Sequence, residues 1–209
     1  MTILKFISGF LLIAFYSCGQ NTAKKKIDPE ATALSNKIIP LVSYLENPDS
    51  CKKALLYLDS ATNIDNNCFT CHHNKLMFLS SLKQFKRAVE TVNECLRLMP
   101  TAYDLYLTGG ILYEKIGDTI SSKKYFEKSL NILNPVLDTM TTQNIEYQVF
   151  SMYKAINLIM IGENKSGNDL LKLLIEREQE PELKQNMLTF MNKTKKQLVE
   201  MFTEAQYSR

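Results

Sequence analysis

This chain of 209 residues has only two histidines, and they are adjacent, His72 and His73. A Ser–His–acid site would have to use one of them, and no G-x-S-x-G nucleophile elbow accompanies the pair. The seven glycines form neither a G-x-G-x-x-G loop nor a phosphate-binding P-loop. We therefore expect no enzyme activity, no catalytic residue, no metal site and no cofactor.

The chain also lacks a strong excess of charge of one sign. Its formal net charge is +3, and removal of residues 1–17, which contain Lys5 and no acid, lowers this charge to +2. Nucleic-acid-binding domains usually carry a marked basic patch. We therefore expect no nucleic-acid partner.

The N-terminus indicates export. Residues 1–17 combine Lys5, a short apolar run and small Ser17 before Cys18, which is typical of a secretory signal. The apolar run is too short for a permanent membrane span. The cysteine at the cut site resembles the signal peptide of bacterial lipoproteins, although Phe15 and Tyr16 replace the usual leucine and small residue, as in Bacteroidetes-type members. An ordinary signal peptide cut nearby is the alternative.

This resemblance implies lipidation of Cys18 and a membrane anchor in the bacterial cell envelope. Residues 18–28 are polar and predict a flexible tether. Surface-exported relatives of this type carry an acidic stretch after the cysteine, which is absent here. The resemblance therefore implies the periplasmic side of the outer membrane.

The mature body has the apolar spacing of helices throughout and no alternation of period two, which predicts an all-α fold. Its second helices repeat every 34 residues, and the helices before them keep the same register. Three sets of residues are each 34 apart: Ala54, Ala88 and Ser122; Leu58, Val92 and Phe126; Ala61, Cys95 and Ser129.

This period resembles the tetratricopeptide repeat (TPR), most closely in residues 101–134. Tyr106, Gly110, Tyr113, Gly117 and Phe126 hold signature places there. The resemblance implies a TPR-like α-solenoid of about four antiparallel helix pairs over residues 29–180, with pairs at 29–66, 67–100, 101–134 and 142–178. We expect Pro40 to kink the first helix.

A further amphipathic segment at 181–205 predicts one C-terminal capping helix, because an open-ended stack must cover its last apolar face. In TPR proteins the first helix of each pair supplies a concave peptide-binding surface. The matching positions are Asn36, Ile39, Ser43, Glu46, Thr70, His73, Met77, Ser80, Asp104, Leu107, Ile111 and Glu114.

The segment CFTCHH at 68–73 contains C-x-x-C-H, the pattern of covalent haem attachment. A c-type haem electron carrier using Cys68, Cys71 and His72 is therefore one hypothesis. In the repeat register, Cys71 and Cys95 should be neighbours in an antiparallel helix pair, which predicts a possible disulfide between them. Buried thiols without a bridge remain open as well.

The function that we expect is binding of a protein or peptide partner in the envelope by a non-enzymatic, lipid-anchored scaffold or assembly factor. The haem carrier is one alternative and a purely structural envelope protein is the other. Fold class alone does not distinguish these functions.

Overall fold

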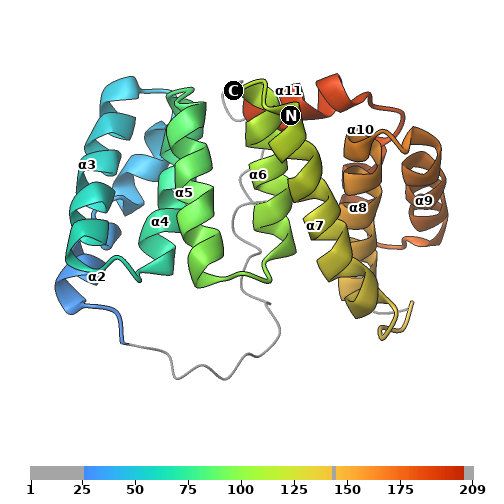
Figure 1. The fold of residues 1–209 in the computed structure, drawn as a ribbon, viewed down its shortest axis with the longest axis horizontal. Coiled ribbons are helices and arrows are strands. Elements are labelled where there is room, and N and C mark those ends of the chain that lie inside the picture. Colours follow the sequence, from blue (N-terminus) through green and yellow to red (C-terminus); the bar gives the residue numbers. More distant parts are fainter. Residues whose placement is uncertain (1–25, 143–144, 205–209) are drawn as a thin grey trace. The chain divides into compact units, whose positions relative to one another are not determined.

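The computed structural model describes residues 26–142 and 145–204. The signal segment 1–17, the lipidation site Cys18 and most of the tether 18–28 lie outside these described residues. Within them the chain forms ten α-helices and one 3-10 helix, with no strand (Figure 1). The all-α prediction is confirmed. The helices divide between two compact units, the residues through Pro100 and Thr101–Glu204.

Unit 1 contains α2 (Pro29–Asn36), η1 (Ile39–Tyr44), α3 (Pro48–Ile64), α4 (Phe69–Ser81) and α5 (Phe85–Leu98). The helices α2, α3, α4 and α5 pack in chain order, each against the next. Asp28 caps α2, its side chain accepting from the backbone N–H of Glu30 at 2.8 Å. The predicted kink at Pro40 is a full break, because α2 ends at Asn36 and Pro40 lies in the separate 3-10 helix η1.

Unit 2 contains α6 (Tyr103–Lys115), α7 (Thr119–Leu137), α8 (Ile145–Ile161), α9 (Asn164–Arg177), α10 (Pro181–Phe190) and α11 (Lys195–Glu204). From α6 to α10 each helix packs against the next, as a solenoid-like stack requires. The predicted single helix at 181–205 is wrong. It is two helices, separated by a turn in which Asn192 has a positive φ of 58°.

The predicted repeat register is visible in the packing. All nine residues of the three sets spaced by 34 are completely buried: Ala54, Leu58, Ala61, Ala88, Val92, Cys95, Ser122, Phe126 and Ser129. Gly110 lies against Phe126, and a Cβ atom at Gly110 would collide with that ring. Small residues are therefore needed where the two helices of this pair approach closely.

Three helices end in the same way. Lys83, Gly117 and Gly162 follow α4, α6 and α8 with φ values of 54°, 86° and 100°. Each N–H donates to the carbonyl three residues earlier, and the next residue's N–H donates to the carbonyl five residues before it, as in Gln84 to Leu79 at 2.8 Å. This is the Schellman motif, in which a left-handed residue satisfies the last carbonyls of a helix. It sets the same tight turn in the second, third and fourth pairs.

Candidate functional site

The CFTCHH segment forms the start of α4 in unit 1. Cys68 is the N-cap residue, and its Sγ accepts a hydrogen bond from the backbone N–H of Cys71 at 3.2 Å. The two cysteines form a disulfide with their Cα atoms 5.3 Å apart. Both are buried with Ala31 and Ala61, and Ile27 packs against this cluster.

The predicted Cys71–Cys95 bridge is therefore wrong, because Cys71 is bonded to Cys68 and Cys95 keeps its thiol. The side chain of an N-cap residue lies over the first helical turn and reaches the residue three positions later. This geometry brings Cys68 close to Cys71. Cys51 is also a buried thiol, and burial raises its pKa, so it is a poor nucleophile.

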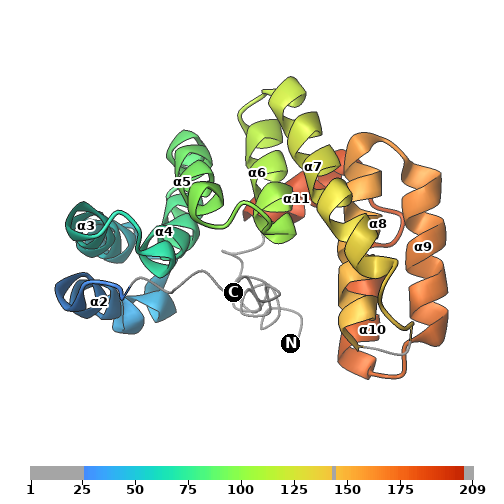
Figure 2. The same ribbon diagram turned by 60° about the horizontal axis from the view of Figure 1, so that its bottom comes forward.

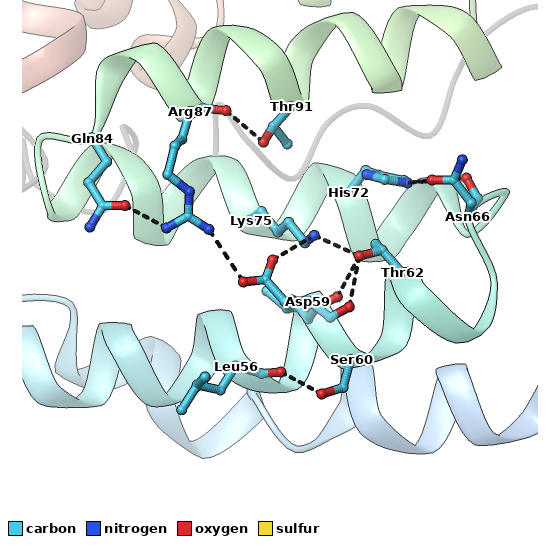
Figure 3. Close-up of polar contacts among 11 residues, drawn as sticks. Leu56, Asp59, Ser60, Thr62, Asn66, His72, Lys75, Gln84, Arg87 and Thr91 are labelled. Atoms are coloured by element: carbon cyan, nitrogen blue, oxygen red, sulfur yellow. Dashed lines mark hydrogen bonds and ion pairs between the residues drawn. The ribbon is translucent and has the colours of Figure 1, made fainter.

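His72 is buried beside this disulfide, and its Nε2 lies 3.1 Å from the backbone oxygen of Asn66 and 3.2 Å from the side-chain Oδ1 (Figure 3). Because both partners are acceptors, Nε2 carries the proton and donates. Burial lowers the pKa of His72, so the ring is neutral at pH 7. Arg97 also donates to the Asn66 backbone oxygen, at 2.9 Å.

These residues do not fit a haem attachment site. Thioether formation needs two free thiols, whereas Cys68 and Cys71 are bonded to each other in this structure. An axial histidine also needs a ring nitrogen facing iron, whereas Nε2 of His72 is held by Asn66. The CFTCHH segment serves here as the capped and cross-linked start of α4.

A polar network links α3, α4 and α5. Asp59 on α3 pairs with Lys75 of α4 at 2.8 Å and with Arg87 of α5 at 3.3 Å (Figure 3). Lys75 also donates to the Thr62 hydroxyl at 2.7 Å, and its side chain is only 11% exposed. Every charged group in this network has a partner, which indicates that it fastens three helices together rather than binding a ligand.

The predicted contact positions in unit 1 are accessible. We call them the A surface of unit 1, because the repeat pattern assigns them to the first helix of each pair, although Glu46 lies in the turn after η1. Four are exposed (Asn36, Ile39, Ser43 and Glu46) and four are half-buried (Thr70, His73, Met77 and Ser80). Tyr44, beside them in η1, is exposed too. His73 stacks on Phe69, with ring centres 5.5 Å apart, and burial lowers its pKa. This surface mixes apolar, hydroxyl, amide and acidic groups.

The predicted contact positions in unit 2 behave differently. Leu107 and Ile111 on α6 are 1% and 5% exposed, so these two are core residues and the prediction that they contact a ligand directly is wrong for this structure. Asp104 is half-buried, and burial raises its pKa. Glu114 is bound within the unit: its Oε2 accepts from the Ser122 hydroxyl at 2.8 Å and pairs with Lys195 of α11 at 2.7 Å.

The contact of α11 with α6 has no counterpart in the sequence analysis. A local signal for its start is nevertheless present in Thr194-Lys-Lys-Gln197. The Thr194 N–H donates to the Gln197 side chain at 2.9 Å, and the Gln197 N–H donates to the Thr194 hydroxyl at 3.2 Å. This reciprocal pair is a capping box, the S/T-x-x-E/Q signature of a helix N-terminus. It marks where α11 begins, but it carries no information on where α11 packs.

The part of the chain that the structure describes offers neither a metal centre nor a membrane-spanning helix. No group of three or more His, Cys, Asp or Glu side chains there could hold a metal ion. Among the same residues, no helix has the length and apolar character needed to cross a membrane. Compared with known proteins, the chain matches no protein-family model and no curated protein.

Proposed function

We propose that this protein is a non-enzymatic binding module of the bacterial cell envelope, anchored by a lipid on Cys18 and holding a protein or peptide partner on the A surface of unit 1. The observation that carries this proposal is the accessibility of all eight predicted contact residues of that surface. The second helices of these pairs, α3 and α5, instead have their repeat positions in the core. In this proposal the A surface makes the contact with the partner, and the buried repeat positions stabilise the fold.

The chemistry of the A surface favours a peptide over a small polar ligand. Ile39 is 67% exposed, and Tyr44 is exposed in the same short helix η1. Hydroxyl groups of Ser43 and Thr70 and the carboxylate of Glu46 can hydrogen-bond a peptide main chain or a basic side chain. The resemblance to tetratricopeptide repeats supports the same surface, since the first helices of the pairs form the binding face in that family.

The proposal is tested by cross-linked co-purification from the native envelope, with the partner identified by mass spectrometry. We expect Ile39→Glu to reduce recovery of the partner several-fold, because it places a charge where an apolar contact forms. The matched control is Leu56→Glu on α3, since Leu56 is also 67% exposed but lies outside the A surface. Equal recovery with both variants would contradict the proposed surface.

The anchor is tested separately by Cys18→Ala. We expect this variant to lose lipid labelling and to leave the membrane fraction, because a single diacylated cysteine holds the chain to the bilayer. A Cys18→Ala variant that still fractionates with membranes after a salt and carbonate wash would contradict lipid anchoring.

A further inference from the structure

The C-terminal helix α11 does not continue the stack. After α10, which packs against α9, the chain turns back, and α11 lies against α6 and α8 (Figure 2). These are the first helices of the third and fourth pairs, the ones that correspond to the binding face in the resemblance above. The helix α11 therefore lies on the part of unit 2 where a ligand would be expected.

The attachment of α11 resembles the binding of an amphipathic peptide. Leu198 and Val199 are buried, which provides an apolar pair. One turn earlier, Lys195 pairs with Glu114 at 2.7 Å. Glu114 is one of the contact residues predicted from the sequence, and the Ser122 hydroxyl holds its carboxylate in place from α7. A preformed acceptor of this kind suits a lysine in the sequence pattern Lys-x-x-Leu-Val.

The same attachment is limited in extent. The described part of α11 has ten residues, fewer than the roughly 12–15 that an isolated helix needs to be even marginally stable in water. Its other face is exposed at Lys196 and Gln197. The second ion pair, Lys115 with Glu204 at 2.8 Å, has an exposed carboxylate. Segments with few buried contacts open at low free-energy cost.

We propose that the surface formed by α6 and α8 is a binding site for an amphipathic helix with a lysine one turn before an aliphatic pair, and that α11 occupies this site within the chain until such a partner helix displaces it. This inference rests on the proposed function, because it names the class of ligand for a second surface, which is formed by first helices of pairs in unit 2. When a partner helix displaces α11, α10 stays in place as the cap of the stack.

The test uses the full chain and a fluorescent peptide with the sequence of residues 191–204, followed by fluorescence anisotropy. Leu198→Asp should release α11, because it buries a carboxylate in an apolar contact. We expect this variant to bind the peptide at least tenfold more tightly than the unmodified protein, whose own α11 competes. The control is Lys196→Asp, on the exposed face of α11, which should bind the peptide like the unmodified protein.

A charge exchange checks the site itself. In the Leu198→Asp background, Glu114→Lys should weaken peptide binding, and a peptide carrying Lys195→Glu should restore it. Hydrogen exchange on the same variant should show loss of protection in α11 alone. Equal peptide affinity of the Leu198→Asp variant and the unmodified protein, no restoration by the exchanged charges, or loss of protection throughout α6–α9 would each overturn the inference.

The two experiments separate the two claims. Partner recovery with Ile39→Glu depends on unit 1, whereas peptide binding depends on α6 and α8 of unit 2. If the peptide binds as expected but Ile39→Glu has no effect on recovery, the proposed surface in unit 1 fails and the exchange of α11 stands. If Ile39→Glu abolishes recovery but the peptide does not bind, only the exchange of α11 fails.

Discussion

Replacing Lys83 with glycine should stabilise the protein. Lys83 occupies the left-handed position that ends α4, with φ of 54°, where the third and fourth pairs have Gly117 and Gly162. A residue with a Cβ atom in this conformation costs about 1–2 kcal/mol relative to a right-handed one. Glycine removes that strain but loses about 0.5–1 kcal/mol more backbone entropy on folding.

The expected net gain in the free energy of unfolding for Lys83→Gly is about 0.5–1 kcal/mol. For a chain of this size such a change raises the melting temperature by about 1–4 °C. The reverse change, Gly117→Ala, should destabilise by about 1 kcal/mol. No atom beyond the neighbouring residues of the chain lies within 4 Å of the place where its Cβ would be, so the cost would come from the backbone conformation.

The measurement is urea unfolding followed by circular dichroism. The variants are compared by their free energies of unfolding, provided that the dependence of this free energy on urea concentration has the same slope in each. Lys83→Ala is the control, since it removes the exposed lysine side chain and keeps a Cβ atom at the same φ. We expect no change in stability from this control beyond a few tenths of a kcal/mol. If Lys83→Gly were no more stable than Lys83→Ala, the backbone account of this turn would be refuted.

Three further predictions concern the polar and close-packed positions. Asp59→Asn should lower the free energy of unfolding by about 1–3 kcal/mol, because it leaves the nearly buried ammonium of Lys75 without its carboxylate, and urea unfolding measures this change. Gly167→Ala should cost about 1–3 kcal/mol in the same assay, since its Cβ would lie 2.7 Å from the backbone oxygen of Ala155. The stability should also fall as the pH drops below about 6.5, because the pKa of folded His72 is lower than the unfolded value and the unfolded chain takes up the proton first. Unfolding measured between pH 7.5 and 5 should show a weaker fall for His72→Gln.

Matched control variants accompany the predictions for Asp59 and Gly167. Asp169→Asn removes an exposed ion pair with Lys165 on α9 and should have almost no effect on stability. Ser166→Ala, at an exposed position next to Gly167, should also be neutral. Equal losses for Asp59→Asn and Asp169→Asn would contradict the fastening role of the Asp59 network. An unchanged pH profile in His72→Gln would place the titrating group elsewhere, for example at His73.

Much of the helical framework could be predicted from local patterns. The 34-residue spacing of small and apolar residues located the helices of the second and third pairs, because each close approach between helices needs a small side chain wherever it recurs. Asp28 and Gly117 marked helix ends for equally local reasons, a side-chain acceptor and a left-handed backbone. The A surface of unit 1 was predicted from the same register, and whether it binds a partner stays a prediction.

Two of the predictions that failed concern which groups lie next to a given side chain. Cys71 pairs with Cys68 in its own helical turn, whereas the predicted partner Cys95 lies across a helix pair. Leu107 and Ile111 are apolar residues on a helix face that the repeat pattern assigns to ligand, yet they are buried. Helical spacing shows which side of a helix is apolar, but it does not show whether a ligand or another part of the chain lies against that side.

The sequence by itself determined the all-α class and the recurring spacing of buried small and apolar residues, because these depend on contacts between near neighbours along the chain. Only the tertiary structure decided that residues 195–204 leave the end of the stack and lie against α6 and α8. The contact between Glu114 and Lys195 joins residues far apart in the chain, and nothing in the spacing of either residue specifies the other. Such long-range pairing depends on the path of the whole chain, which local periodicity does not encode.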